Sequence, residues 1–322
     1  MSFDSFLIDT AKLLGWISLN YKNGKKGEGI NRIDFCGNLK MYRIHSVILI
    51  LGTISFSFFY IWYYIFVYDF PEKTVYLSNQ LKCSWDFVTC CYLLINGFCK
   101  SLSLDFLFKM KYNLQESEIS KVPKRMRTDY LFLITCFLFI PIEIFILAKL
   151  TEYKENLSQR MFELIIYRIM GACITIPSAL IVLIFYKLTI QIILSFKKIQ
   201  EIFKKQLNLL KNSKSSLLEV ADVLNKSNIQ MLYISLFIKE ISNYFTTSFV
   251  FIMTYAFFST LLETFYLIYA DSLEFIDWIW IGVMILHYLS YFIPIIATPS
   301  FFLYQVIVYK ILNYNLIFFI IV

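Results

Sequence analysis

Four ionisable side chains lie inside long apolar stretches of this sequence, a setting in which an ionisable group needs a specific reason to be present. They are Glu143, Arg168, Glu263 and His287. A charge at mid-bilayer depth costs a few kcal/mol, so we treat each of these residues as a candidate functional residue. His287 shares a helix face with Tyr291, and Tyr288 follows it directly. We expect all six side chains to line one polar, aromatic cavity suited to a small organic ligand.

Structural roles remain open for the same residues. The long side chain of Arg168 can extend to the outer membrane interface, and a single histidine among aromatic residues is commonly a packing residue. Glu143 and Glu263 lie near the outer ends of their apolar stretches, where water can reach them without a pocket. The ligand pocket is therefore one interpretation beside ordinary packing and solvation.

The sequence shows no pattern typical of an enzyme. It contains no HExxH motif, no Ser/His/Asp set and no paired carboxylates at mid-membrane depth, and "NGKKGEG" at 23–29 lacks the ending of a phosphate-binding loop. The two histidines are far apart, which disfavours a metal site. The seven cysteines are odd in number and lie mostly within or beside apolar stretches, unlike a disulfide framework. We predict a protein that is not an enzyme and has no metal or cofactor.

The elements that must position these residues are membrane-spanning helices. Of the 322 residues, 58% are hydrophobic and 16% are charged, which is too apolar for a soluble domain of this size. Apolar runs of about 20 residues recur, and this length crosses a bilayer as a helix. The predicted fold class is all-α, a polytopic transmembrane helical bundle with six spans. The spans are expected near 45–68, 84–106, 129–150, 166–194, 249–270 and 278–303.

Basic residues set the orientation of this bundle. Lys and Arg concentrate in the N-terminal segment and in alternate loops, among them the predicted loop at 107–128, so the positive-inside rule places the N-terminus in the cytoplasm. The net charge of +7 is mainly this topology signal; membrane lipids are expected partners and nucleic acid is not. Asn156, in "NLS" of a predicted outer loop, is a candidate glycosylation site. The predicted divisions are a cytoplasmic segment at 1–44, spans one to four at 45–195, a cytoplasmic helical extension at 196–248, spans five and six at 249–303, and a tail at 304–322 too short for a seventh span.

The predicted extension at 196–248 has the pattern of amphipathic helices. Apolar residues recur at three- and four-residue steps while lysines occupy the other face. The stretch "NSKSS" at 212–216 interrupts the pattern, which predicts two helices. They either lie on the lipid surface or, as we favour, pack with partner helices as an assembly stalk. The residues expected to serve assembly are Phe203, Leu207 and Leu210.

Several stretches together resemble the insect gustatory receptor family, which is related to the odorant receptors. They are "AKLLGWISLNY" at 11–21, "MYRIHSVILI" at 41–50 and "ISNYFTTSFVFIMTYAFFSTLLETFYLIY" at 241–269, and the likeness in layout covers about residues 1–305. The resemblance implies a multi-pass chemosensory receptor of the plasma membrane, with seven spans and its N-terminus inside. It also implies homo- or hetero-tetrameric assembly with related subunits into a ligand-gated cation channel.

The family model also implies where the parts of such a channel lie. The ligand would bind in the outer half of the first six spans, the inner helix extensions would form a cytoplasmic anchor, and span seven would line the pore. The family signature of span seven is Thr-Tyr, then five mostly apolar residues, then Gln-Phe. This signature is missing. Thr254 and Tyr255 begin a similar stretch, but Leu261 and Leu262 stand where Gln-Phe would be. We expect a chain truncated before the seventh span, which leaves open whether it conducts ions by itself.

The predicted function is a gustatory receptor subunit, active in sensory perception of taste, that detects small tastants or contact chemicals. Two alternatives stay open. One is a secondary-type membrane transporter with its site near His287 and Glu143, and the other is a membrane protein without a ligand. Ligand-evoked current without solute uptake would favour the receptor, whereas saturable uptake without channel currents would favour the transporter.

Overall fold

The computed structural model of this protein describes most of the predicted helices. The described residues are 3–14, 16, 19–21, 33–35, 39–66, 73–116, 157–211 and 217–269, with parts of 275–307, where residues 281–289 are helical. The elements in chain order are α1 (Phe3–Leu13), β1 (Leu19–Tyr21), β2 (Ile33–Phe35), α2 (Leu39–Phe66), α3 (Lys73–Cys99), α4 (Ser101–Glu116), α6 (Leu157–Lys211) and α7 (Leu217–Tyr269). Predicted span three, at 129–150, lies outside the described residues.

The all-α fold class is confirmed, with one small addition near the N-terminus. Strands β1 and β2 form an antiparallel pair in which Asn20 lies opposite Asp34. Just before β1, Trp16 is completely buried, and its backbone N–H donates to the carbonyl of Ala11 at 2.8 Å. Ser46 on α2 donates a hydrogen bond to the carbonyl of Leu14 at 3.1 Å. The N-terminal helix is therefore packed onto the bundle rather than separate from it.

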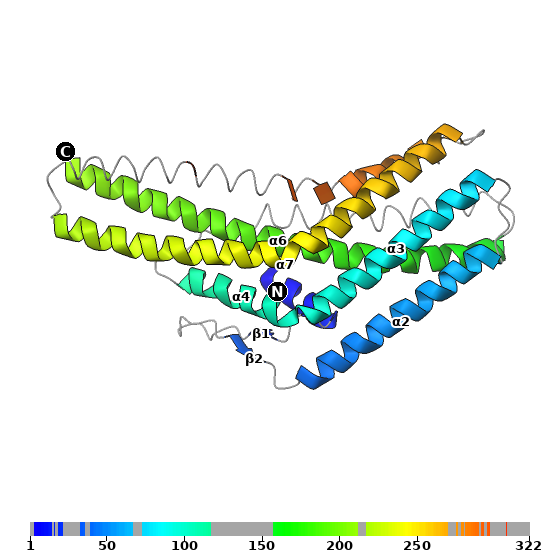
Figure 1. The fold of residues 1–322 in the computed structure, drawn as a ribbon, viewed down its shortest axis with the longest axis horizontal. Coiled ribbons are helices and arrows are strands. Elements are labelled where there is room, and N and C mark those ends of the chain that lie inside the picture. Colours follow the sequence, from blue (N-terminus) through cyan, green and yellow to red (C-terminus); the bar gives the residue numbers. More distant parts are fainter. Residues whose placement is uncertain are drawn as a thin grey trace.

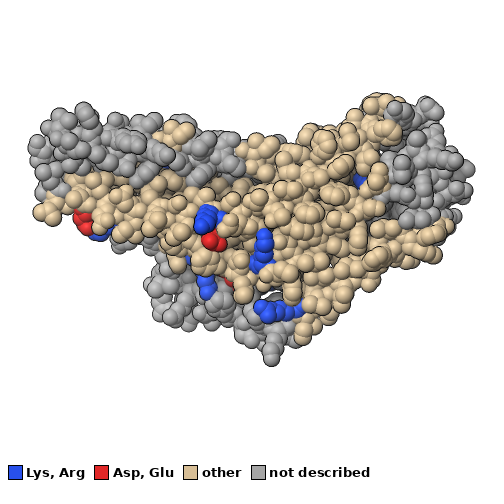
Figure 2. Space-filling view, viewed as in Figure 1, with Lys and Arg blue, Asp and Glu red and all other residues tan. Residues whose placement is uncertain are grey.

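Helices α2 and α3 lie side by side (Figure 1), and a contact between Phe58 and Phe87, with ring centroids 5.4 Å apart, joins them. The outer side of α2 is apolar and uncovered, as Ile48 and Phe66 are 62% and 73% exposed. A lipid environment makes this exposure favourable, because lipid tails are as apolar as the side chains themselves. Among the described residues on the face seen in Figure 2, the charged side chains of Lys, Arg, Asp and Glu are few.

Predicted span two is two helices rather than one. The segments Ser84–Cys99 and Ser101–Leu114 meet at an angle of 65° at Lys100. The amide of Lys100 still donates to Asn96 at 2.9 Å, and its carbonyl accepts from Leu104 at 3.1 Å, so hydrogen bonding continues through the bend. Gly and Ser residues are common at such kinks, and Gly97 and Ser101 flank this one. As a result, the start of the predicted loop at 107–128 is helical and belongs to α4.

Helices α6 and α7 are far longer than a membrane span. They contain 55 and 53 residues, so each is about 80 Å long at 1.5 Å per residue, against roughly 30 Å of hydrocarbon. Pro177 lies within α6 without ending it. In Figure 1 the two helices run together beyond the end of α4, so they form an elongated two-helix projection from the bundle.

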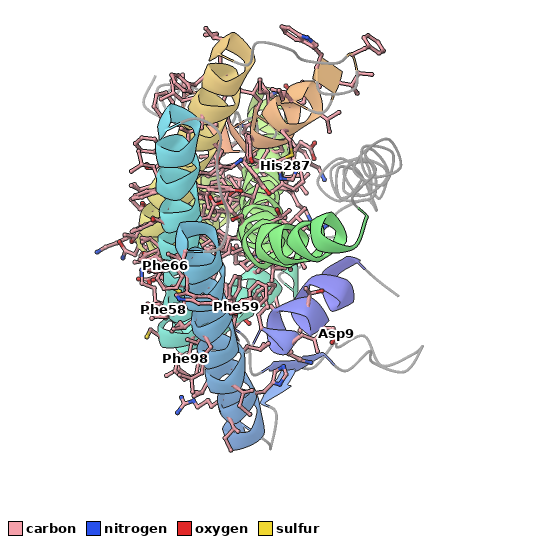
Figure 3. The ribbon with its side chains drawn as sticks, turned by 90° about the vertical axis from the view of Figure 1, so that its right-hand side faces the viewer. Asp9, Phe58, Phe59, Phe66, Phe98 and His287 are labelled. Carbon is pink, nitrogen blue, oxygen red and sulfur yellow. The ribbon has the colours of Figure 1, made fainter. Side chains whose placement is uncertain are left out.

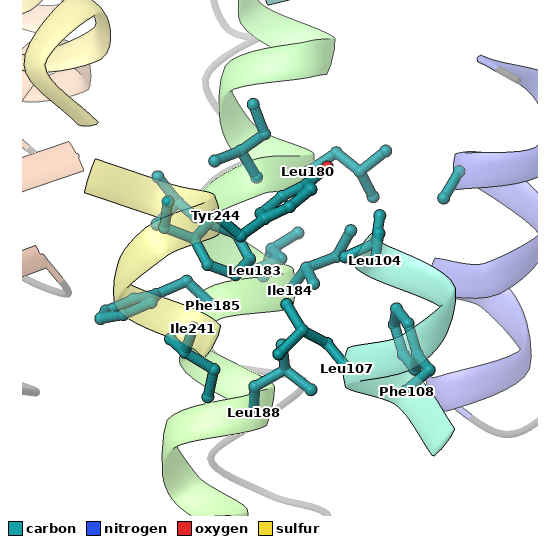
Figure 4. Packing of buried hydrophobic residues seen from close by; sticks show 14 of the residues in the cluster. Leu104, Leu107, Phe108, Leu180, Leu183, Ile184, Phe185, Leu188, Ile241 and Tyr244 are labelled. Carbon is teal, nitrogen blue, oxygen red and sulfur yellow. The ribbon is translucent and has the colours of Figure 1, made fainter. Parts of the chain in front are cut away.

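The core lies where α4, α6 and α7 meet. Leu183 and Leu188 of α6 are fully buried, and they pack with Leu107 of α4 and Ile241 of α7 (Figure 4). A hydrogen bond of 2.9 Å from the Asn96 amide to the Ser248 hydroxyl ties α3 to α7. These contacts fix the relative position of the helices that carry the candidate site.

By length and composition, two described helical segments suffice to cross a membrane. They are Thr175–Gln206 and Leu218–Leu262, and the bent pair of α3 and α4 makes a third if it counts as one span. Arg43–Phe59 of α2 is apolar but shorter. The described part of the chain is thus a membrane-type helical bundle.

Candidate functional site

His287, Tyr288 and Tyr291 are buried together on one helical segment. Their side chains are 2%, 1% and 1% exposed. The Tyr291 hydroxyl and His287 Nε2 are 3.0 Å apart and hydrogen-bonded, one helical turn from each other. In Figure 3 His287 lies among the helices in the upper part of the bundle, away from Phe58 on α2. The predicted shared face of His287 and Tyr291 is confirmed by this bond.

Tyr255 of α7 extends this group, which we call the His287 cluster: His287, Tyr288, Tyr291 and Tyr255. The rings of Tyr255 and Tyr288 meet edge to face, with centroids 5.6 Å apart and planes at 90°. Aromatic rings prefer this geometry because the positive ring edge faces the negative ring face. Tyr255 is 4% exposed, so the contact buries two phenol groups between α7 and the segment at 281–292.

Charged groups of α3 lie close to the His287 cluster. Lys82 and Asp86 both interact electrostatically with Tyr255, and Asp86 is 8% exposed. Trp85, between them in sequence, stacks on Phe251 of α7 with centroids 6.3 Å apart and planes at 9°. Helix α3 therefore brings a carboxylate, an ammonium group and an aromatic surface to the same region of α7.

The other predicted pocket residues are not placed beside this cluster by the described structure. Glu143 lies outside the described residues, as does the predicted glycosylation site Asn156. The backbones of Arg168 and Glu263 lie in α6 and α7, while their side chains lie outside the description. Three of the six predicted residues are thus brought together, and their role in ligand binding stays a prediction.

Two groups near the site were missed by sequence reasoning, although a signal was present. Asp86 and Tyr255 lie within predicted spans, and Asp86 meets the same rule that selected Glu143, since ionisable residues within spans are functional candidates. Asp86 lies near one end of the predicted span at 84–106, a position that water can reach without a pocket. Tyr255 had no such signal, because its position in the cluster depends on how α7 packs.

Helix α4 carries a second buried polar group that the sequence did not single out. Asp105 and Lys111 are 3% and 1% exposed. The Lys111 ammonium lies 5.8 Å from the Phe108 ring centroid and 5.5 Å from that of Tyr112, so cation–π attraction contributes to its stability there. The bend at Lys100 turns α4 into the core, and this explains why residues of a predicted loop are buried.

The predicted assembly residues are only partly described. Phe203 of α6 is 1% exposed and belongs to the core of the single chain. Its burial comes from packing within one chain. The side chains of Leu207 and Leu210 lie outside the described part, so their contact with partner helices stays a prediction.

The chemistry of the His287 cluster suits recognition of a small molecule. An imidazole and phenol hydroxyls can donate and accept hydrogen bonds, and the surrounding rings offer apolar contact. Ligand sites typically combine such an apolar wall with a few placed polar groups. Among the described residues, no group of three or more His, Cys, Asp or Glu side chains has the arrangement of a metal site.

Comparison with known proteins finds solved structures that share the overall arrangement of this chain. The overall arrangement is similar to solved structures of an insect olfactory receptor, OR5 from Machilis hrabei. One structure superposes with a TM-score of 0.60 at 14% identity, and the match covers 98% of this chain and 81% of that chain. The other, in complex with eugenol, has a TM-score of 0.57 at 14% identity and covers 91% and 77%.

At this identity the likeness establishes the fold. The chain is therefore a helical membrane bundle with the fold of an insect olfactory receptor. No protein-family model matches the sequence, and a search of curated proteins finds no significant match.

Proposed function

We propose that this protein is a chemosensory receptor subunit of the ligand-gated cation channel type. The observation that carries the proposal is the fold, which it shares with an olfactory receptor solved in complex with eugenol, a small aromatic compound. Sequence features add the gustatory assignment, so the ligands proposed are small tastants or contact chemicals. The protein acts by binding and gating rather than by catalysis.

The His287 cluster is the proposed ligand site. It combines a buried imidazole, three phenols and the nearby Asp86 carboxylate, which together suit a small polar aromatic compound. Arg168 and Glu263, and Glu143 beyond the described residues, are proposed to complete its lining. The N-terminus is proposed to be cytoplasmic, with the protein in the plasma membrane.

The two histidines of the chain provide a matched test of the site. His287 is buried, whereas His45 lies exposed on α2. Cells that express the protein, with related subunits where needed, would be challenged with a panel of small aromatic compounds while current is recorded. His287→Ala should shift the half-maximal ligand concentration at least about tenfold, because a desolvated hydrogen bond and packing are lost.

His45→Ala should leave the dose–response curve unchanged, since its side chain is outside the cluster. Surface expression of both variants would be measured by labelling. Superimposable dose–response curves for wild type and His287→Ala, at equal surface expression, would remove the cluster from the ligand site.

We further propose that the long α6 and α7 helices act as an assembly stalk. The two helices are longer than a membrane span requires, and both stretches of the predicted extension keep apolar faces over several turns, which supports this role. Replacing Leu207 and Leu210 by Asp should reduce co-purification of differently tagged subunits. Unaltered co-purification would favour the lipid-surface interpretation.

A further inference from the structure

A cavity lies between α6, α7 and Ile295. Its volume is about 650 Å³, within the roughly 300–1,000 Å³ of small-molecule sites. Its described lining contains none of the four side chains of the His287 cluster, so it differs from the proposed ligand site. We call it the α6–α7 groove.

Three phenylalanines make one wall of the α6–α7 groove. Phe185 of α6 meets Phe249 of α7 edge to face at 4.6 Å between centroids, and it meets Phe245 at 5.5 Å. Phe185 and Phe245 are 8% and 1% exposed. Because these side chains are buried and packed against one another, they are held in place. An apolar ligand can therefore pack on them with little further ordering of the side chains.

Hydroxyl-bearing side chains of both helices also line the groove. Ser242, Thr246 and Thr254 follow one face of α7 at steps of four and eight residues, and Thr189 contributes from α6. The rest of the described lining is apolar, and no charged side chain belongs to it. A ligand that fits here is neutral and mostly hydrophobic, because a charged group would be desolvated without a counter-charge.

The threonine hydroxyls are set to accept hydrogen bonds. Thr246 donates to the Ser242 carbonyl at 2.6 Å, and Thr254 donates to the Val250 carbonyl at 2.6 Å. Thr189 donates to the Phe185 carbonyl at 2.9 Å. A hydroxyl has one hydrogen and two lone pairs, so a group whose hydrogen is already donated offers only lone pairs. The Ser242 hydroxyl lies 3.5 Å from the Thr246 hydroxyl and can donate to one of its two lone pairs, which leaves the other available. The threonines of the groove therefore favour a ligand that supplies a donor.

We propose that the α6–α7 groove binds a neutral hydrophobic alcohol or phenol, whose O–H group donates to the oxygen of Thr246 or Thr189. The apolar part of the ligand packs on the phenylalanine wall. Such binding needs no channel opening. The binding proposal can therefore be tested separately from the proposed receptor function.

A pair of probes that differ only in the donor tests this directly. The purified full chain in detergent would be titrated with 4-tert-butylphenol and with its methyl ether, and binding followed by calorimetry. The phenol should bind about five- to tenfold more tightly than the ether, the value of one net hydrogen bond. Equal affinities, or no binding of either probe, would overturn the proposal.

Isosteric variants identify the acceptors. The double variant Thr189→Val and Thr246→Val keeps the volume and removes both oxygens, so the preference for the phenol should fall below about twofold. Thr264→Val is the control, because Thr264 makes the same bond to the Thr260 carbonyl at 2.8 Å and is absent from the described lining of the groove. A preference that persists in the double variant would contradict the assignment of these threonines.

Filling the groove gives a second, independent measurement. Val250 lies on its rim and is 58% exposed, so Val250→Trp can be accommodated without disturbing the core. This variant should lose binding of both probes, and unchanged binding would place the phenol elsewhere. Titrations in nanodiscs with and without a sterol distinguish two natural sources of the ligand. Weaker phenol binding in the presence of the sterol indicates a membrane alcohol. Equal phenol binding with and without the sterol indicates a dissolved small molecule.

Discussion

Replacing Gly97 by Ala should destabilise the bundle through a single steric contact. A Cβ atom built on Gly97 overlaps the five-membered ring of Trp16, far inside ordinary van der Waals contact. Trp16 is fully buried, so its ring cannot move aside into solvent. Overpacking of this kind costs about 1–3 kcal/mol, offset by about 1 kcal/mol of gained helix propensity. The net loss in free energy of unfolding should be about 0–2 kcal/mol.

Gly52→Ala is the matched control for this change. Gly52 also lies within a helix, α2, but nothing is within 4 Å of a Cβ atom built there. This variant should gain the propensity term of about 1 kcal/mol without a clash. The difference between the two variants, about 1–3 kcal/mol, then isolates the overpacking cost. Unfolding of both variants in mixed micelles would give the two free energies.

A double variant tests whether Trp16 is the cause. In the Trp16→Ala background the ring is gone, so adding Gly97→Ala should cost nothing further and should resemble Gly52→Ala. This non-additivity is expected only for residues in contact. If Gly97→Ala and Gly52→Ala have equal effects in the wild-type background, the packing of the N-terminal segment against α3 is wrong.

Two further predictions concern buried polar contacts, one between helices and one within a helical segment. Asn96→Ala should lower the free energy of unfolding by about 1 kcal/mol, since it removes the hydrogen bond to the buried Ser248 hydroxyl. Asn113→Ala, at an exposed position, should lower it by less. Equal losses for the two variants would contradict the hydrogen bond between α3 and α7. Tyr291→Phe should cost about 0.5–1.5 kcal/mol because it removes the hydroxyl bonded to His287, and a variant as stable as wild type would show that this bond contributes nothing.

Much of the fold was predictable because membrane helices leave a strong signal. Apolar runs of span length predicted the helices now seen in α2, α6 and α7. The bend at Lys100 was not predictable, because hydropathy indicates which residues lie within the membrane but not the direction of the helix axis. The consequence of that bend, a buried Lys111 in a predicted loop, was therefore missed as well.

The candidate site was predictable only in its local part. The spacing of His287 and Tyr291 on one helix turn follows from helix geometry, and the hydrogen bond between them agrees. The addition of Tyr255 and the proximity of Asp86 depend on packing between helices distant in sequence. A single sequence fixes which faces are polar but not which of those faces meet.

The most direct test of the central proposal is a simultaneous measurement of current and solute uptake in cells that express this chain with related subunits. A receptor channel predicts that a small aromatic compound evokes a current whose reversal potential follows the cation gradient, with no accumulation of the compound. Saturable uptake of the compound without any evoked current would contradict the proposal and identify a transporter instead.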